Sequence, residues 1–252
     1  MIKKKVGIFV PVYHRDNKTK KSISSLLETE ARDTSIEIEL SIYIGINGAS
    51  QELLSYIEEK KQEFLNKGMR YEVFKSKTNI GKPKIVNIMV ECLATEIDYV
   101  ISYDSDMIVT DPYWVLKFVK IFESYKGDKK IGALCSQQSG NCCHVLDKDP
   151  FIYTAGDFTL ITRAGNEGVA GGVLVTPFSI WESLGGYMAH RVYASDDAHY
   201  ALSCANNNLL MAVVKEIEVY HPFEDDSGYV DWKARAARDL LMPEELGGYF
   251  LS

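Results

Sequence analysis

The sequence lacks the cysteine patterns of disulfide-rich and zinc-binding proteins. Its 252 residues include five cysteines, and none forms a Cys-x-x-Cys pair with another. An odd number of cysteines without a secretory signal indicates reduced thiols, so we expect a cytoplasmic protein. Cys142 and Cys143 precede a histidine, but adjacent cysteines rarely bind one ion together and no further ligands are visible. A structural zinc site is therefore disfavoured.

Long apolar runs are also absent. The opening segment MIKKKVGIFVPVYHRD places lysines before apolar residues, as a signal peptide does, but its apolar stretch covers only 6–12 and contains Pro11. No segment approaches the roughly 20 apolar residues of a membrane helix. We therefore expect no membrane span and interpret residues 6–12 as a first buried strand.

The chain has no excess of positive charge. It carries 28 Lys and Arg against 35 Asp and Glu, a formal net charge of −7. Sequence-independent DNA binding usually requires a basic face. The composition therefore shows no strong nucleic-acid signature, although it leaves room for a local basic groove.

Glycine is missing from the loop where two nucleotide-binding classes need it. The segment after the first strand reads PVYHRDNKTK. A dinucleotide oxidoreductase needs a GxGxxG turn at this point. A sugar-nucleotide nucleotidyltransferase needs a glycine-rich, basic loop in the same place, so both classes are disfavoured.

The first half of the chain alternates between two apolar periodicities. Strand-like segments cover 6–12, 36–46, 69–76 and 98–104, and helix-like segments cover 18–28, 50–68 and 82–95. In the helix predicted at 50–68, Ser50 is a plausible cap and Gly68 a stop. This βαβαβαβ order predicts an α/β fold with a parallel sheet covered by helices on both faces.

The second half is less regular, and we see no repeat and no linker. It predicts helices at 111–125, 177–186 and 196–208, and strands at 129–138, 168–176 and 209–222. The last of these segments can also be a pair of strands. Residues 138–168 have weak periodicity, and the tail from residue 223 is rich in charge and aromatic residues. One domain is the best interpretation.

Polar residues follow the carboxyl ends of the predicted parallel strands, which is where ligands bind in such sheets. Asp104 and Asp106 lie there as an Asp-x-Asp motif. Two such carboxylates can hold Mg²⁺ or Mn²⁺ shared with a phosphorylated substrate. The alternative is a turn in which an aspartate side chain caps the backbone.

Three further segments carry candidate residues, each with a simpler interpretation. His221 can add an imidazole to the same ion, or it merely ends a strand. Asp196 and Asp197 open a predicted helix, where acids are favoured by the helix dipole anyway. The turn from Asn79 to Lys82 precedes a helix N-terminus, which is a natural anion site or only a loop-to-helix junction.

Taken in order, these motifs resemble the GT-A glycosyltransferases, particularly the inverting family 2. VGIFVPVYHR resembles their opening strand, and NIGKPKIVN matches the frame of their Asn-x-Gly…Asn segment at Asn79, Gly81 and Asn87. YDSD matches their Asp-x-Asp motif. GVAGGVLVTPFSIWESLGGY, SDDAHY and VYHP resemble the stretch before the catalytic acid, the acidic motif and the later histidine. The resemblance covers about residues 5–222.

The resemblance implies a Rossmann-like, mostly parallel central sheet flanked by helices, with a smaller mixed second half. It implies a single domain, 1–252, with a nucleotide-sugar-binding half at 1–110, an acceptor and catalytic half at 111–222, and a tail or lid at 223–252. Trp232, Lys233 and Arg235 can supply that lid, or they belong to an amphipathic surface helix.

The activity implied is metal-dependent transfer of a hexosyl or pentosyl group from a nucleotide sugar, with inversion, to an acceptor hydroxyl. A UDP-sugar is the expected donor, and the acceptor is a glycan or another hydroxyl compound. The cofactor is Mn²⁺ or Mg²⁺, bound by Asp104, Asp106 and His221, and Asp197 is the catalytic base. The expected donor-binding residues are Pro11, Val12, Tyr13, Arg15, Asn47, Asn79, Lys82, Asp104, Ser105 and Lys233. The expected acceptor-side residues are Asp196, Gly171 and Gly172.

The chain also departs from the family pattern. Asn47 stands where an acidic residue usually contacts the nucleobase, Val86 replaces an arginine, and His14 replaces an asparagine. Residues 138–168, where such enzymes shape the acceptor pocket, match no segment of the family. A retaining GT-A enzyme and a non-catalytic nucleotide- or carbohydrate-binding module remain as alternatives. The oligomeric state is not predicted.

Overall fold

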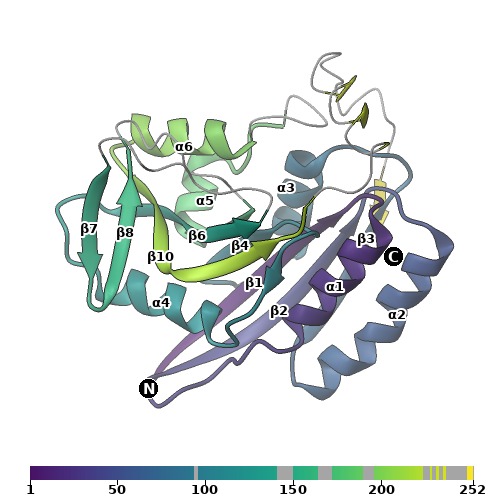
Figure 1. The fold of residues 1–252 in the computed structure, drawn as a ribbon, viewed down its shortest axis with the longest axis horizontal. Coiled ribbons are helices and arrows are strands. Elements are labelled where there is room, and N and C mark those ends of the chain that lie inside the picture. The colour runs from purple at the N-terminus through teal and green to yellow at the C-terminus, as the bar shows by residue number, and fades with distance from the viewer. Residues whose placement is uncertain are drawn as a thin grey trace.

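One mixed β-sheet runs through the protein (Figure 1). The computed structural model describes residues 1–93, 96–140, 150–163, 172–189, 196–223, 228, 231–232, 235–236 and 249–251. Within these residues the sheet has 11 strands in the order β11-β3-β2-β1-β4-β9-β6-β10-β8-β7, with β5 paired to β10. Gly171, Lys233, Cys142 and Cys143 lie outside the described residues.

The first half is the predicted parallel layer. Strands β3, β2, β1 and β4 lie side by side and parallel. The strands are β1 (Ile2–Val12), β2 (Ile36–Ile46), β3 (Arg70–Ser76) and β4 (Tyr99–Tyr103). The helices that connect them are α1 (Asp16–Leu26), α2 (Gln51–Asn66) and α3 (Lys82–Leu93). The alternation expected from the sequence is confirmed, and Ser50 caps α2 by accepting a hydrogen bond from the Leu53 amide.

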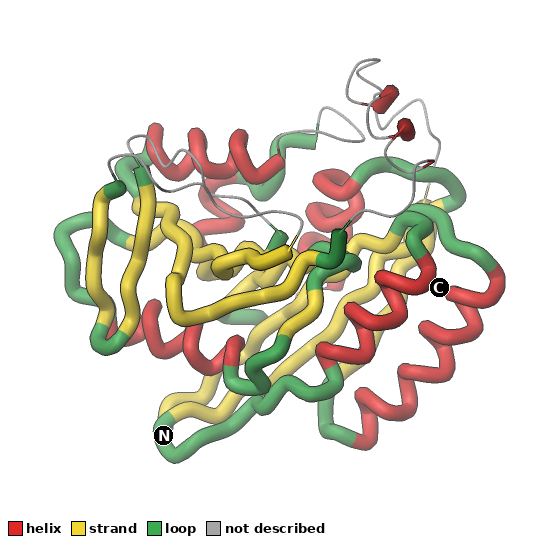
Figure 2. The backbone as a smooth tube through the Cα atoms, viewed as in Figure 1, coloured by secondary structure: helices red, strands yellow, loops and turns green. Residues whose placement is uncertain are grey.

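Helices cover both faces of this layer, and each face has its own apolar core (Figure 2). On β1, Ile8 and Val10 contribute to one core, together with residues of α1, α2 and α4 (Trp114–Ser124). Phe9 points to the other core, which is formed with α3, α5 (Phe178–Leu184) and α6 (Asp196–Asn206). Alternate residues face opposite sides because side chains repeat every two residues along a strand. Burial on both faces explains the nearly continuous apolar run of β1.

The second half of the sheet mixes directions. Strand β9 (Val173–Pro177) is antiparallel to both β4 and β6 (Ile131–Gly140), whereas β6 and β10 (Leu210–His221) are parallel. The short strand β5 (Ile108–Val109) follows the Asp-x-Asp motif and pairs antiparallel with the end of β10. This pairing brings the carboxyl end of β10 to the rim of the parallel layer.

Three features of the fold were not predicted. Residues 151–162, where periodicity is weak, form a hairpin of β7 (Phe151–Ala155) and β8 (Phe158–Thr162) around a Gly156 turn with φ of 59°. Strand β11 (Tyr249–Leu251) pairs with β3 and forms the edge of the sheet. The first strand begins at Ile2, before the apolar run, and the register of β1 and β2 places Lys3 and Lys5 opposite Glu37 and Glu39.

None of the helices in the described part of the chain combines the length and the apolar character needed to cross a bilayer.

Candidate active site

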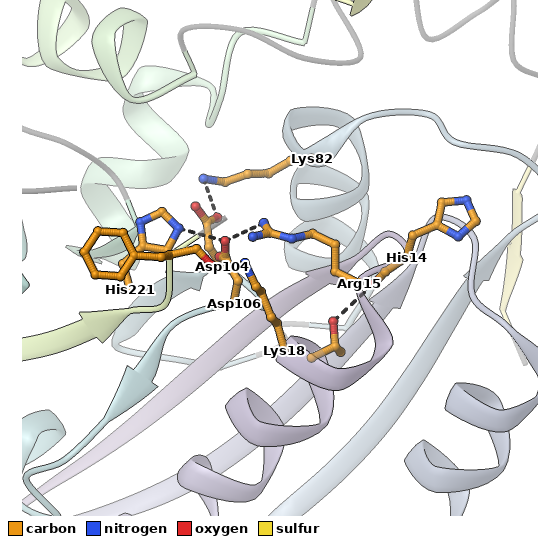
Figure 3. Close-up of polar contacts among 9 residues, drawn as sticks. His14, Arg15, Lys18, Lys82, Asp104, Asp106 and His221 are labelled. Carbon is orange, nitrogen blue, oxygen red and sulfur yellow. Dashed lines mark hydrogen bonds and ion pairs between the residues drawn. The ribbon is translucent and has the colours of Figure 1, made fainter. Parts of the chain in front are cut away.

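The candidate site lies at the rim where the parallel strands end (Figure 3). Arg15 follows β1, Lys82 opens α3, Asp104 and Asp106 follow β4, and His221 ends β10. The parallel strands point the same way, so the segments after them meet at one edge of the sheet. This edge of the sheet therefore brings together residues that are far apart in the chain, such as Arg15 and His221, which are more than 200 positions apart.

Asp106 is the centre of this cluster. Its Oδ2 lies 2.5 Å from Nη1 of Arg15 and 2.9 Å from Nε2 of His221. All three side chains are largely buried. His221 reaches Asp106 because the antiparallel pair places Tyr220 opposite Ile108, two residues beyond the aspartate. Among the described residues, the buried Nδ1 of His221 has no hydrogen-bond partner.

The loop before α1 holds Arg15 in an unusual backbone conformation. His14 and Arg15 have φ angles of 50° and 59°, both in the left-handed region. Two such residues in a row cost about 1–3 kcal/mol each, and they persist only where the surroundings impose them. The His14 amide donates to Gly48 O at 3.1 Å, and Arg15 O accepts from the amides of Lys18 and Thr19. As a result Arg15 points toward Asp106 and His14 points away (Figure 3).

A second ionic cluster connects the two halves of the site. Nζ of Lys82 lies 2.7 Å from Oδ1 of Asp104 and 2.8 Å from Oδ2 of Asp196, the first residue of α6. Burial raises the pKa of Asp104 to about 6, assisted by the charges of Asp106 and Asp196 and opposed by Lys82. Burial alone would lower the pKa of Lys82, but the two carboxylates raise it well above its usual value. Lys82 is therefore a permanent cation between the strand rim and α6.

Asp197 stands next to this cluster in the first turn of α6. Its Oδ1 accepts a hydrogen bond from the Ala198 amide at 2.8 Å, and the residue is half-buried. Its negative charge raises the pKa of the Cys135 thiol on β6, although burial is the larger cause. Asp197 therefore lies beside Asp196 at the N-terminus of α6. Whether it is the base stays a prediction.

The other expected donor residues in the described part of the chain lie in two places, near the ends of β1 and β4 and in the loops before α2 and α3. Pro11 and Val12 are buried strand residues of β1, and Ser105 is half-buried between the two aspartates. The ring of Tyr13 contacts the ring of Trp232 from the tail, with centroids 4.8 Å apart and planes at 44°. An aromatic surface therefore borders the rim near the end of β1.

Asn47 and Asn79 shape the loop before α3. Asn47 is buried, and its Oδ1 accepts a hydrogen bond from the Ile80 amide at 3.2 Å. Asn79 Oδ1 accepts from the Gly81 amide at 2.9 Å, and Gly81 has a φ of 85°. The two asparagines therefore position the turn that leads into α3.

Gly172 lies directly behind the Asp-x-Asp motif. Its carbonyl oxygen accepts a hydrogen bond from the Asp104 amide at 2.8 Å. A Cβ at this position would lie 2.6 Å from Nε2 of Gln138 and 2.7 Å from Cε of Met107. A side chain here would displace the ends of both neighbouring side chains, and the bond from the Asp104 amide to Gly172 O helps to hold the backbone that carries Asp104.

Two contacts of the site were missed by sequence reasoning. Nζ of Lys18, buried in α1, donates to the carbonyl oxygen of Phe223 at 2.6 Å and so anchors the chain just beyond His221. Asn87 on α3 bonds both backbone groups of Tyr187. Asn87 belongs to a motif that the sequence marks. No sequence pattern marks Lys18, because a lysine in a helix is usually exposed.

The divalent ion that the resemblance implies needs oxygen or nitrogen ligands. Asp106 offers a carboxylate oxygen, which suits Mn²⁺ and Mg²⁺, and His221 offers an imidazole nitrogen 2.9 Å from it, a ligand typical of divalent transition metals. Across the described residues, no three His, Cys, Asp or Glu side chains form a metal-binding group. Mn²⁺ and Mg²⁺ often use only one or two protein ligands and complete their shell with phosphate and water. The pair therefore fits such an ion, but the Arg15 guanidinium lies on the same carboxylate oxygen.

Residues 4–238 match the family described as Glycosyltransferase like family 2. The chain belongs to this family. A comparison with curated protein sequences finds no match. The predicted α/β fold, with its mostly parallel central sheet and flanking helices, is confirmed.

Solved structures of the same fold include several bound to nucleotides. The chain is 13% identical to the mannosyltransferase PcManGT from Pyrobaculum calidifontis in complex with GDP-Man and Mn²⁺, with a TM-score of 0.65, covering 94% of this chain and 62% of that one. S. aureus TarS is 12% identical, with a TM-score of 0.64, covering 90% of this chain and 38% of that one. GalNAc-T7 with UDP, GalNAc and Mn²⁺ is 12% identical, with a TM-score of 0.64, covering 88% and 43%. This family 2 chain thus spans about two fifths to three fifths of the length of these proteins.

Proposed function

We propose that the protein transfers a sugar from a nucleotide-sugar donor to an acceptor hydroxyl, using a divalent cation. The observation that carries this proposal is the convergence of Asp106, His221, Arg15 and Lys82 at the rim of the parallel sheet. Membership of glycosyltransferase-like family 2 supports it. Structures of the same fold in complex with UDP-GlcNAc and with GDP-Man and Mn²⁺ support it further.

The donor would lie along the rim with its diphosphate beside the cationic side chains. Lys82 is permanently charged and stands at the start of the 12-residue helix α3, whose N-terminus also favours an anion. The aromatic pair of Tyr13 and Trp232 offers a surface against which a nucleobase can pack. Asn47 and Asn79 would act indirectly by holding the turn before α3. A UDP-sugar remains the first donor to test, followed by GDP-mannose.

Asp106 and His221 would hold Mn²⁺ or Mg²⁺, with Asp104 next to them. When bound, such an ion neutralises the charge that develops on the leaving diphosphate. Asp104 is itself held by Lys82 and by the backbone contact to Gly172. The chain's own contribution is thus to fix two carboxylates and an imidazole at one edge before the donor arrives.

Asp197 would take the proton of the acceptor hydroxyl. A carboxylate in hydrogen-bond reach of such a group accelerates the reaction by about 10²–10⁴-fold. Lys82 binds the neighbouring Asp196, so it links the start of α6 to the strand rim. Attack from the α6 side, opposite the leaving diphosphate, would invert the anomeric centre. Gly172 would lie on the acceptor side.

The test is release of nucleoside diphosphate from UDP-sugars and GDP-mannose, measured with Mn²⁺ and with EDTA. Release that requires Mn²⁺ and increases with a sugar acceptor supports the proposal. Nucleotide-sugar binding without any release would indicate a binding module instead. The anomeric configuration of the product, read by NMR, separates inversion from retention. Absence of both binding and release across these donors would refute the proposal.

A further inference from the structure

We infer that Arg15 is the resting counter-ion of Asp106, and that its guanidinium must leave this carboxylate before a divalent cation can bind there. The inference deepens the proposed function and rests on it, since it concerns the proposed metal position. Nη1 of Arg15 lies 2.5 Å from Asp106 Oδ2, and Nε2 of His221 lies 2.9 Å from the same oxygen. A cation placed between the carboxylate and the imidazole therefore competes directly with Arg15.

Burial makes this competition strong. The side chains of Arg15 and Asp106 are only 6% and 9% exposed. Two opposite charges removed from water in this way stabilise each other, because removing one partner of a buried ion pair is strongly destabilising. A divalent cation and a guanidinium on the same oxygen would repel each other across a few ångströms. The two cations are therefore alternatives at Asp106, and each lowers the affinity of the site for the other.

The loop geometry allows the exchange without refolding. The backbone of Arg15 is fixed, since its carbonyl oxygen accepts the amides of Lys18 and Thr19 at the start of α1. The guanidinium sits at the end of a flexible side chain, so it can move while the loop stays in place. Its planar fork matches phosphate oxygens as well as carboxylates. The diphosphate of an incoming donor thus offers Arg15 a new partner when it gives up Asp106.

The experiment measures Mn²⁺ binding to the full chain without any nucleotide sugar, from the electron paramagnetic resonance signal of free Mn²⁺. The variant Arg15→Gln removes the competing charge, and we expect it to bind Mn²⁺ at least tenfold more tightly than the unmodified chain. Arg15→Lys keeps a positive charge and should stay within about threefold of the unmodified chain. Combining Arg15→Gln with Asp106→Asn should abolish the gain.

Lys21→Gln is the matched control, because it removes one positive charge from an exposed position of the same helix. We expect its Mn²⁺ affinity to equal that of the unmodified chain. A folded Arg15→Gln variant with equal or weaker Mn²⁺ affinity would overturn the inference. An equal gain in Lys21→Gln would also overturn it, since the effect would then come from net charge.

A measurement on the unmodified chain decides the question if Arg15→Gln does not fold. The ¹⁵N guanidinium resonance of Arg15, assigned by its loss in Arg15→Lys, should move during titration with Mg²⁺. A resonance that stays in place at saturating Mg²⁺ would overturn the inference. Sugar transfer is measured separately. If the protein transfers sugar but Arg15 does not exchange with the cation, only this inference is wrong. If Arg15 exchanges with the cation but no nucleotide is released, only the proposed reaction is wrong.

Discussion

Asn87 and the backbone of Tyr187 are joined by two hydrogen bonds across 100 positions of the chain. Nδ2 of Asn87 donates to Tyr187 O at 2.7 Å, and the Tyr187 amide donates to Asn87 Oδ1 at 2.9 Å. Gly186 makes room for this contact, because a Cβ there would lie 2.7 Å from Asn87 Oδ1. The pair ties α3 to the turn after α5.

Replacing Asn87 with alanine should destabilise the fold, because two backbone groups of the buried Tyr187 lose their partner. We expect a loss of about 1–3 kcal/mol in the free energy of unfolding, the usual cost of stranding buried polar groups. Urea denaturation measures it. Asn207→Ala is the control, because Asn207 also bonds a backbone carbonyl, that of Ser203, but is exposed. Equal effects of the two substitutions would contradict a special role for Asn87.

Replacing Asp197 with asparagine should remove the proposed base while keeping the size of the side chain. We expect sugar transfer to fall by about 10²–10⁴-fold, the usual contribution of such a base, with donor affinity unchanged. Initial rates and calorimetric titration with the donor measure the two quantities. Asp128→Asn, an exposed control, should behave like the unmodified chain. Normal turnover by Asp197→Asn would show that another group takes the proton.

Replacing Trp232 with alanine should weaken donor binding, because it removes one of the two rings that form the aromatic surface, those of Tyr13 and Trp232. An aromatic contact is worth about 0.5–1.5 kcal/mol, so we expect the donor dissociation constant to rise about two- to tenfold. Calorimetric titration with UDP measures it. Tyr113→Ala is the control, because its side chain is exposed at the start of α4. Unchanged UDP affinity would remove Trp232 from the donor site.

Asp33 should make the stability of the fold depend on pH. Its carboxylate is ion-paired with Lys120 and accepts the amides of Ser35 and Ile36, and these contacts hold its pKa well below its usual range. A depressed pKa in the folded state means stability that is present above the unfolded pKa of about 4. This stability disappears as the pH falls from there through the folded pKa.

The test is Asp33→Asn, compared with the exposed control Asp157→Asn. At pH 7 we expect Asp33→Asn to lower the free energy of unfolding by about 1–2 kcal/mol, a value reduced for screening by solvent. The difference from the unmodified chain should shrink as the pH falls below about 4. A difference that is constant from pH 7 to pH 3 would rule out the carboxylate charge as its source.

The sequence by itself determined the α/β alternation and the edge of the sheet at which Asp104 and Asp106 lie. Strands such as Ile36–Ile46 and helices such as Gln51–Asn66 follow from local periodicity and caps, which depend only on neighbouring residues. Asp104 and Asp106 could be placed on the rim because parallel strands end together. The hairpin at 151–162 was missed since its apolar spacing is weak, and β11 because its pairing with β3 is a long-range contact.

Only the tertiary structure decided how these charged side chains contact one another. The contact between Arg15 and Asp106 depends on a left-handed loop, and the contact between His221 and Asp106 depends on the pairing of β5 with β10. Lys82 reaches Asp196 only because α6 packs over the same rim. These contacts join residues that are far apart in the chain. The separation is 91 positions for Arg15 and Asp106, 115 for Asp106 and His221, and 114 for Lys82 and Asp196. Neighbouring residues in the sequence do not indicate which distant residues come into contact, because these contacts are set by the order of the strands in the sheet.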